Sequence, residues 1–240
     1  MHNRIFITGD KHFPAEYKYL SFKYWPLGRE LSREDYVIIL GDFGICWDNS
    51  AEENWWLDWF NDKPWTTLWI DGNHQNFPLL YSYLIENWKG GQTHVLRPNV
   101  RHLCRGEVFN LNNQTFFTFG GARSVDKIYR TEGKSWWPEE IASYQEMEYG
   151  VNNLEKYNFN IDYILAHCTP NHIVDILYPY ENQHDAMTSY LEHVCQRTHF
   201  NKFFCGHYHI DRSYDNQKYN ILYNDIIELL PNGEIKVVNS

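Results

Sequence analysis

Long apolar runs are missing from this sequence of 240 residues, although 43% of its residues are hydrophobic. The apolar stretches are short and interrupted by Asp, Asn, Lys and Gly, and none approaches the roughly 20 residues that a membrane helix needs. The N-terminal segment MHNRIFITGD also lacks the apolar core of a secretory signal. We therefore expect a soluble, cytoplasmic protein with no membrane partner, folded as one domain over residues 1–240.

Cysteines are few, and their spacing excludes two classes of site. The five are Cys46, Cys104, Cys168, Cys195 and Cys205. Their number is odd, they are widely separated, and no C-x-x-C pair occurs. We expect reduced thiols, with neither a disulfide framework nor a thiolate zinc site.

Positive charge is scarce: the sequence has 21 Lys and Arg residues and 31 Asp and Glu residues, which gives a net charge of −10. Non-specific affinity for nucleic acid comes chiefly from neutralising phosphates with Lys and Arg. A long nucleic acid is therefore not the partner that we expect. A local positive site, such as a bound metal, could still attract a small phosphate compound.

Aromatic residues are abundant, at 18% of the chain, and several tryptophans are clustered. Trp55, Trp56, Trp59, Trp65 and Trp69 are examples. We favour a core and helix-packing surface rich in rings, because rings bury large apolar areas. Base stacking is the alternative interpretation.

Three similar segments indicate a parallel sheet in the first third of the chain. Residues 4–10, 36–42 and 66–74 each hold an unalternated apolar run that ends in Gly-Asp or Gly-Asn-His. Such runs suit strands buried on both faces. Between the last two, residues 50–63 show helical spacing, with Ser50 placed to cap the helix. This order predicts a βαβ unit.

The remainder of the chain mixes strands and helices. Residues 93–119 contain short strand-like runs joined by turn signals, which predict an antiparallel meander. We expect helices over 138–157, with Pro138 in the first turn, and over 184–198. Strands are expected over 161–167 and 202–207, and hairpin-like strands around Asn232-Gly233 at the end.

Metal-capable residues follow five of the predicted strands. They are Asp10, His12, Asp42, Asn73, His74, His167, His207 and His209. Loops at the carboxyl ends of parallel strands converge on one crevice, so these side chains can meet. Carboxylate, imidazole and amide oxygen suit Mn, Fe or Zn. Two ions about 3.5 to 4 Å apart could share one carboxylate, and Asp42 is the candidate bridge.

Other histidines are expected to lie on the surface or in the core rather than to bind metal. Those without a motif are His2, His94, His102, His193 and His199. His172 and His184 follow the fourth motif, and we do not expect them to be ligands either.

The order D-x-H, G-D, G-N-H, H, G-H-x-H resembles the calcineurin-like metallophosphoesterases, in a small bacterial or phage-type form. It appears as GDKH (9–12), GD (41–42), GNH (72–74), AH (166–167) and GHYH (206–209). The resemblance implies an α/β fold, a β-sandwich of mixed sheets flanked by helices in four layers, α/β/β/α.

The resemblance also implies a metal centre with a ligand set for each ion. One ion would be bound by Asp10, His12, Asp42 and His209. The other would be bound by Asp42, Asn73, His167 and His207. His74 would face the substrate phosphate. We expect manganese first, with iron or zinc as alternatives.

Two departures from the family pattern narrow these expectations. Protein Ser/Thr phosphatases carry G-D-x-x-D-R-G at the second motif, whereas this chain has GDFGICWD (41–48), so we do not expect a protein phosphatase. The third motif is GNHQ, without the acidic residue that often follows the histidine. Asp48 and Asp71 are candidates for the group that orients His74.

These features predict a dinuclear-metal-dependent phosphoesterase, a phosphodiesterase or phosphatase of a small nucleotide-like substrate. A metal-bridging hydroxide would attack phosphorus. His74 would donate a hydrogen bond to the phosphoryl oxygen or a proton to the leaving group. The alternatives are a nuclease acting on DNA or RNA and a non-catalytic binding scaffold.

A long loop over residues 119–140 is a candidate for substrate recognition. It carries Arg123, Arg130 and Trp136, which could bind a second phosphate or stack on a base. An ordinary surface loop is the alternative.

Overall fold

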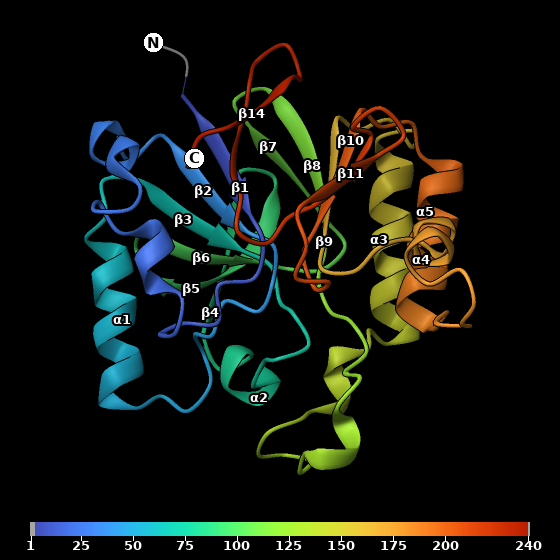
Figure 1. Ribbon diagram of the computed structural model, residues 1–240, viewed down its shortest axis with the longest axis horizontal. Helices are drawn as coiled ribbons and strands as arrows, with labels where there is room; N and C mark the ends of the chain where they lie inside the picture. Colours follow the sequence, from blue (N-terminus) through green and yellow to red (C-terminus); the bar gives the residue numbers. More distant parts are fainter. Residues whose placement is uncertain (1–2, 240) are drawn as a thin grey trace.

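Two β-sheets lie face to face in the computed structural model, which describes residues 3–239, and helices cover the outer face of each sheet (Figure 1). The arrangement confirms the predicted four-layer α/β/β/α sandwich of mixed sheets.

Within residues 3–239, the first sheet contains eight strands in the order β14-β13-β1-β2-β3-β6-β5-β4. Strands β1, β2, β3 and β6 are parallel neighbours, and the others pair antiparallel at the two edges. The bounds are β1 Ile5–Thr8, β2 Tyr36–Ile39, β3 Thr66–Trp69, β4 Leu84–Trp88, β5 Gly91–Arg97, β6 Val100–Leu103, β13 Ile226–Leu229 and β14 Ile235–Val237.

The second sheet has six strands in the described part of the chain, in the order β11-β12-β10-β9-β8-β7. Strands β8, β9, β10 and β12 run parallel, with β7 and β11 antiparallel at the edges. The bounds are β7 Glu107–Leu111, β8 Gln114–Phe119, β9 Tyr163–Ala166, β10 Lys202–Cys205, β11 Arg212–Tyr214 and β12 Tyr219–Ile221.

Helix α1 covers the first sheet, whereas α3, α4 and α5 cover the second (Figure 1). Ser50 caps α1 as predicted, since its side chain accepts a hydrogen bond from the Glu53 N–H. The bounds are α1 Ala51–Asn61, α2 Phe77–Leu80, α3 Tyr144–Lys156, α4 Asn171–Leu177 and α5 Ala186–Arg197. Short 3-10 helices span Tyr17–Leu20, Pro26–Glu30, Lys127–Tyr129 and Pro138–Glu140.

The core explains why the central strands have no polar alternation. In β2, Tyr36 and Ile38 face the second sheet, and Val37 and Ile39 face α1 and its neighbours. All four are buried, so both faces of the strand lie in an apolar layer. Aromatic rings fill much of this interior, as predicted, although Trp55 is exposed.

The predicted meander over 93–119 is wrong in its continuity. Strands β5 and β6 form an antiparallel hairpin in the first sheet. The chain then crosses to the second sheet, where β7 and β8 form a separate hairpin. The crossing occurs at Gly106, which has φ +74° and packs against the backbone of Gly150 in α3. A side chain there would collide with α3, so the turn requires glycine.

The predicted helix over 138–157 begins later than expected. Pro138 starts a 3-10 turn instead, and α3 begins at Tyr144. Ser143 and Glu146 form a capping box that satisfies the free N–H groups of a new helix start. The short elements α2, α4 and β4 were not predicted, because each lacks a long periodic pattern.

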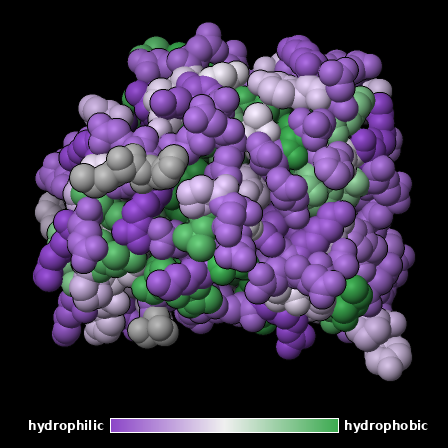
Figure 2. Space-filling model, turned by 90° about the horizontal axis from the view of Figure 1, so that it is seen from above, coloured by the Kyte–Doolittle hydropathy of each residue, from purple (hydrophilic) through white to green (hydrophobic). Residues whose placement is uncertain are grey.

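The remaining strand and helix predictions are confirmed. Strands β9 and β10, helix α5 and the hairpin of β13 and β14 all lie inside their predicted ranges. The helices within residues 3–239 are too short or too polar to cross a bilayer. The face shown in Figure 2 is mostly hydrophilic, with apolar side chains in small separate groups.

Candidate active site

The predicted metal ligands follow the carboxyl ends of five parallel strands. Strands β1, β2 and β3 belong to the first sheet, and β9 and β10 belong to the second. The structure brings their end loops together where the two sheets meet. Asp10, Asp42 and His167 are buried there, and His209 is the most exposed, at 48% of its side chain.

One group of donors is formed by Asp10, His12 and His209. The Nε2 atoms of the two histidines lie 3.1 Å apart, and His209 Nε2 lies 3.4 Å from Asp10 Oδ2. Their donor atoms all fall within 4.8 Å of one another. Tyr223 stacks on the His209 ring, with centroids 4.6 Å apart, and holds this exposed side chain in place.

A second group surrounds the amide oxygen of Asn73. His167 Nε2 lies 3.1 Å and His207 Nδ1 lies 3.0 Å from this atom. His167 Nε2 also lies 3.6 Å from Asp42 Oδ2. The two histidines of the GHYH motif therefore belong to different groups, as the resemblance implies. Tyr208 between them turns away, and its hydroxyl contacts Thr169.

Neighbouring groups orient these donors. The Nδ1 atom of His167 lies 2.7 Å from the Leu40 carbonyl, so Nδ1 carries a proton and Nε2 is the ring nitrogen that can bind a metal. Asp10 accepts a hydrogen bond from the His207 N–H, and Asp42 accepts one from the His74 N–H.

Asn73 is oriented by a separate pair that the sequence did not reveal. Its Nδ2 donates to Ser124 Oγ at 3.1 Å, which in turn donates to Glu140 Oε2 at 2.6 Å. Because the amide nitrogen is committed to Ser124, the amide oxygen must face His167 and His207.

Backbone strain is concentrated in these loops. His12, Asp42, His207 and His209 all have positive φ, between 31° and 70°. Non-glycine residues adopt this region at a cost, and such strain clusters at functional sites. Gly72 allows the third motif to pass directly against Asp42, because a side chain there would overlap the carboxylate.

The donor set fits metal ions. With metal–nitrogen and metal–oxygen bonds of about 2.0–2.1 Å, neighbouring ligand atoms lie roughly 2.9 to 3.4 Å apart in octahedral or tetrahedral geometry. The separations above run from 3.0 to 3.6 Å. Ring nitrogens that face one another at 3.1 Å can both use their lone pairs only if a cation lies between them.

The charges of the buried side chains also favour a bound cation. Burial raises the pKa of Asp10 to about 7, although His167 opposes the shift. Burial would also raise the pKa of Asp42, but His167, His74 and His12 together hold it well below its usual range. Burial lowers the pKa of His167, yet Asp42 and Asp10 outweigh it and raise this pKa to about 9. Without a cation, two protons therefore neutralise the site.

We expect metal affinity to rise with pH, because a bound cation must displace these protons. Asp10 and His167, whose pKa values are both raised, each give up a proton when a cation binds below those values. The affinity should therefore increase with pH, by up to about tenfold per pH unit for each proton displaced. Calorimetric Mn²⁺ titration at pH 6, 7 and 8 measures this slope. An affinity that does not change with pH would contradict it.

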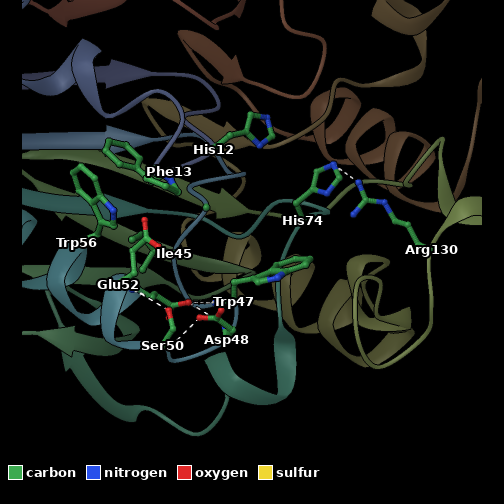
Figure 3. Close-up of a pocket in the computed structure, with 13 residues that line it drawn as sticks. His12, Phe13, Ile45, Trp47, Asp48, Ser50, Glu52, Trp56, His74 and Arg130 are labelled. Atoms are coloured by element: carbon green, nitrogen blue, oxygen red, sulfur yellow. Dashed lines mark hydrogen bonds between the residues drawn. The ribbon is translucent and has the colours of Figure 1, made fainter.

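A cavity of about 350 Å³ opens beside the donors (Figure 3). His12, His74 and Arg130 line one side in this view, and Phe13 and Trp56 lie at the other end. His74 Nε2 lies 3.9 Å from Asp42 Oδ2 and 3.4 Å from Arg130 Nη2. Its ring is therefore held between the predicted metal ligands and a fixed cation.

Neither carboxylate suggested for orienting His74 does so. The Asp71 carboxylate contacts Arg105 and His102, and Asp48 accepts from the Ser50 N–H. Arg130 contacts His74 instead. Two hydrogen bonds of 2.7 Å to Asp126 fix its guanidinium.

The other predicted substrate residues do not line this cavity. Arg123 donates to Gln183 and pairs with Asp185, beside a smaller cavity that His207 also lines. Trp136 is only 7% exposed and packs under the Lys127 ammonium group. Trp47, which was not predicted, lines the larger cavity.

The isolated histidines lie outside the centre, apart from His2, which falls outside the described residues. His172 contacts Glu192, His184 contacts Asp175, and His193 contacts Arg197. His94 and His102 face one another at 3.1 Å.

Some solved structures match most of this chain at low sequence identity. Among solved structures, phosphopantetheinyl hydrolase from Mycobacterium tuberculosis is 15% identical, with a TM-score of 0.46, and the match covers 93% of this chain and 90% of that one. A candidate 5'-nucleotidase from Staphylococcus aureus is 14% identical, with a TM-score of 0.49; the match covers 98% of this chain but 52% of that one. No curated protein matches the chain.

The family model described as calcineurin-like phosphoesterase matches residues 3–211, a range that contains all five motifs. The chain therefore belongs to the calcineurin-like phosphoesterases and is a metal-dependent phosphoric ester hydrolase.

Proposed function

We propose that this protein hydrolyses a phosphodiester or phosphomonoester of a small nucleotide-like molecule with two metal ions bound at the described centre. One observation carries the proposal: two groups of donors, around Asp10 and around Asn73, meet at buried carboxylates beside a cavity that His74 and Arg130 line. Two groups with separate histidines suit two ions better than one.

The residues have distinct roles in this proposal. Asp10, His12 and His209 would hold one ion, and Asn73, His167 and His207 the other, with Asp42 shared between them. When bound, the ions polarise the phosphoryl group and lower the pKa of a water molecule. The choice of metal among Mn, Fe and Zn follows availability, since the same donors suit all three.

His74 would donate a hydrogen bond to a phosphoryl oxygen. Burial lowers the pKa of its imidazole, although Asp42 opposes the shift, so the ring is mostly neutral near pH 7. A neutral imidazole donates one N–H hydrogen bond and has no additional proton to transfer. This favours stabilisation of the phosphoryl oxygen over proton transfer to the leaving group, the two roles that the sequence left open.

The cavity supports a small substrate. Its volume of about 350 Å³ lies near the lower end for ligand pockets, roughly 300 to 1,000 Å³. Trp47, Trp56 and Phe13 offer aromatic faces, and Asp48 and Glu52 offer carboxylates. Carboxylates can accept hydrogen bonds from sugar hydroxyls or base amino groups, but they repel an extended polyanion.

Arg130 is the expected phosphate-binding cation, and its loss should weaken substrate binding. Hydrogen bonds to charged groups contribute about 1.5 to 3 kcal/mol. Arg130→Ala should therefore lower kcat/KM by roughly 10- to 100-fold, mostly through KM. Steady-state kinetics against Arg197→Ala, a surface arginine that packs on Phe159, provides the comparison. Equal kinetics for both variants would remove Arg130 from the substrate site.

Parallel assays of the metal-loaded protein test the proposed substrate class. The panel contains a phosphomonoester, a phosphodiester, nucleotides, and single- and double-stranded DNA and RNA. Metal-dependent hydrolysis of the small compounds is the expected result. Cleavage confined to the polymers would indicate a nuclease, and no hydrolysis of any compound by metal-loaded protein would indicate a binding scaffold.

A further inference from the structure

A second cluster of metal-binding side chains lies in the first sheet and belongs to none of the five motifs. His94 on β5 is the antiparallel partner of His102 on β6. Cys104 follows two residues after His102, so it projects from the same face. His94 Nδ1 lies 3.1 Å from His102 Nδ1 and 3.5 Å from Cys104 Sγ. The three donor atoms all lie within 4.8 Å of one another.

The absence of a C-x-x-C pair led us to expect no thiolate zinc site. Strand pairing provides the missing proximity here. His102 and Cys104 come from alternate positions of β6 and its extension. His94 comes from the paired position on the neighbouring strand β5. This spacing of ligands has no short sequence signature.

Asp71 fixes the tautomer of His102. Its Oδ1 lies 3.1 Å from His102 Nε2, and Arg105 Nε donates to its Oδ2 at 2.8 Å. Burial would raise the pKa of Asp71, but Arg105 and His102 outweigh it and hold this pKa well below its usual range, so the group is a carboxylate. The His102 proton therefore resides on Nε2, and its Nδ1 presents a lone pair to His94. Metal-bound histidines commonly make this contact with a carboxylate.

A neutral hydrogen-bonded cluster would use only part of this contact geometry. If His94 Nδ1 carries a proton, it donates to His102 Nδ1, and the Cys104 thiol then has no ring nitrogen of this pair as an acceptor. If His94 Nδ1 accepts from the thiol instead, two ring lone pairs face each other at 3.1 Å. One cation among the three atoms would use all three contacts, because both ring nitrogens and the thiolate sulfur direct lone pairs at it.

Tetrahedral zinc fits the separations of His94 Nδ1 from the other two donor atoms. With Zn–N about 2.05 Å and Zn–S about 2.3 Å, the expected N–N and N–S separations are roughly 3.3 and 3.6 Å. The structure has 3.1 and 3.5 Å. A cavity of about 110 Å³ that all three residues and Tyr81 line leaves room for a water as fourth ligand.

We infer that His94, His102 and Cys104 bind a zinc ion, separate from the ions of the phosphoesterase centre. His94 and His102 are only 5% and 2% exposed, so an ion bound there would be largely shielded from water. The ion would connect β5 and β6, and through Asp71 the end of β3.

Cobalt substitution tests the site without an activity assay. The full-length protein is freed of metal with a chelator and titrated with Co²⁺. We expect the titration to develop a near-ultraviolet thiolate-to-cobalt absorption with the intensity of one thiolate-bound ion per chain, which the carboxylates and imidazoles of the other centre cannot give. Cys104→Ser should abolish this absorption, and Cys195→Ser, at a part-buried cysteine of α5, should retain it.

Two further measurements keep the test decisive. His94→Gln, which retains the thiol, should reduce the Co²⁺ affinity measured from this absorption at least tenfold, and circular dichroism checks that each variant is folded. Elemental analysis should find one fewer zinc ion per chain in Cys104→Ser than in Cys195→Ser. Absence of the thiolate absorption from the wild-type protein, or its persistence in Cys104→Ser, would overturn the site and leave a hydrogen-bonded core.

Discussion

Replacing His74 with alanine should leave the metal content unchanged and lower kcat by roughly 10² to 10³, the range for a lost hydrogen bond to a developing oxyanion. The contacts of His74 explain why its replacement should change kcat but not the metal content. The His74 backbone N–H donates to Asp42 Oδ1 at 2.9 Å, and alanine keeps that bond. The ring, in contrast, is 27% exposed and lines the cavity, and its Nε2 lies 3.9 Å from Asp42 Oδ2.

Elemental analysis and kinetics on the same preparation measure both quantities for His74→Ala. His184→Ala is the matched control, since His184 lies on the exposed loop before α5 and pairs with Asp175 of α4. We expect the control to retain wild-type turnover. A His74→Ala protein with full activity would remove this residue from the mechanism, and loss of metal would make it a ligand rather than a substrate contact.

Replacing Asp42 with asparagine should have the larger effect, because it removes a buried negative charge that both ions are proposed to share. Metal ions supply several kcal/mol of stabilisation to the transition state, and a loss of about 4 kcal/mol corresponds to roughly a 10³-fold lower rate. We expect kcat/KM to fall by at least this factor and at least one ion per chain to be lost. Asparagine is similar in size, so packing against Gly72 should survive.

Asp175→Asn provides the comparison for Asp42→Asn, since it makes the same chemical change at an exposed carboxylate. Thermal unfolding in excess chelator separates folding from metal binding, because neither variant then gains stability from bound ions. Asp42→Asn with both ions and normal turnover would refute the shared-ligand role. In the structure, Asp10 Oδ2 lies 3.4 Å from His209 Nε2, whereas Asp10 Oδ1 lies 3.5 Å from His167 Nδ1, the nitrogen that faces the Leu40 carbonyl.

Short-range sequence signals predicted the parts of the fold that position the centre. Strands β1, β2 and β3 were recognisable because both of their faces are buried, so their apolar runs are continuous. Each run ends in a glycine and a polar residue, and parallel strands bring such ends together. The five motifs therefore indicated a shared crevice before any tertiary contact was known.

Contacts between distant segments could not be predicted from the sequence. The change of sheet at Gly106 depends on its packing against Gly150, 44 positions along the chain. Ser124 and Glu140 orient Asn73 from a loop that carries no metal motif. The cluster of His94, His102 and Cys104 exists only because β5 and β6 pair in one register. A shift of one residue would move His94 to the other face of the sheet.

Metal stoichiometry against activity tests the dinuclear phosphoesterase centre most directly. The measurement uses Cys104→Ser protein, which lacks the proposed zinc ligand, freed of metal and titrated with Mn²⁺ while hydrolysis of a phosphodiester or nucleotide is followed. We predict that activity appears with metal and reaches its plateau at two equivalents per chain. A plateau at one equivalent would contradict the dinuclear centre, and hydrolysis at full rate without metal would contradict metal dependence altogether.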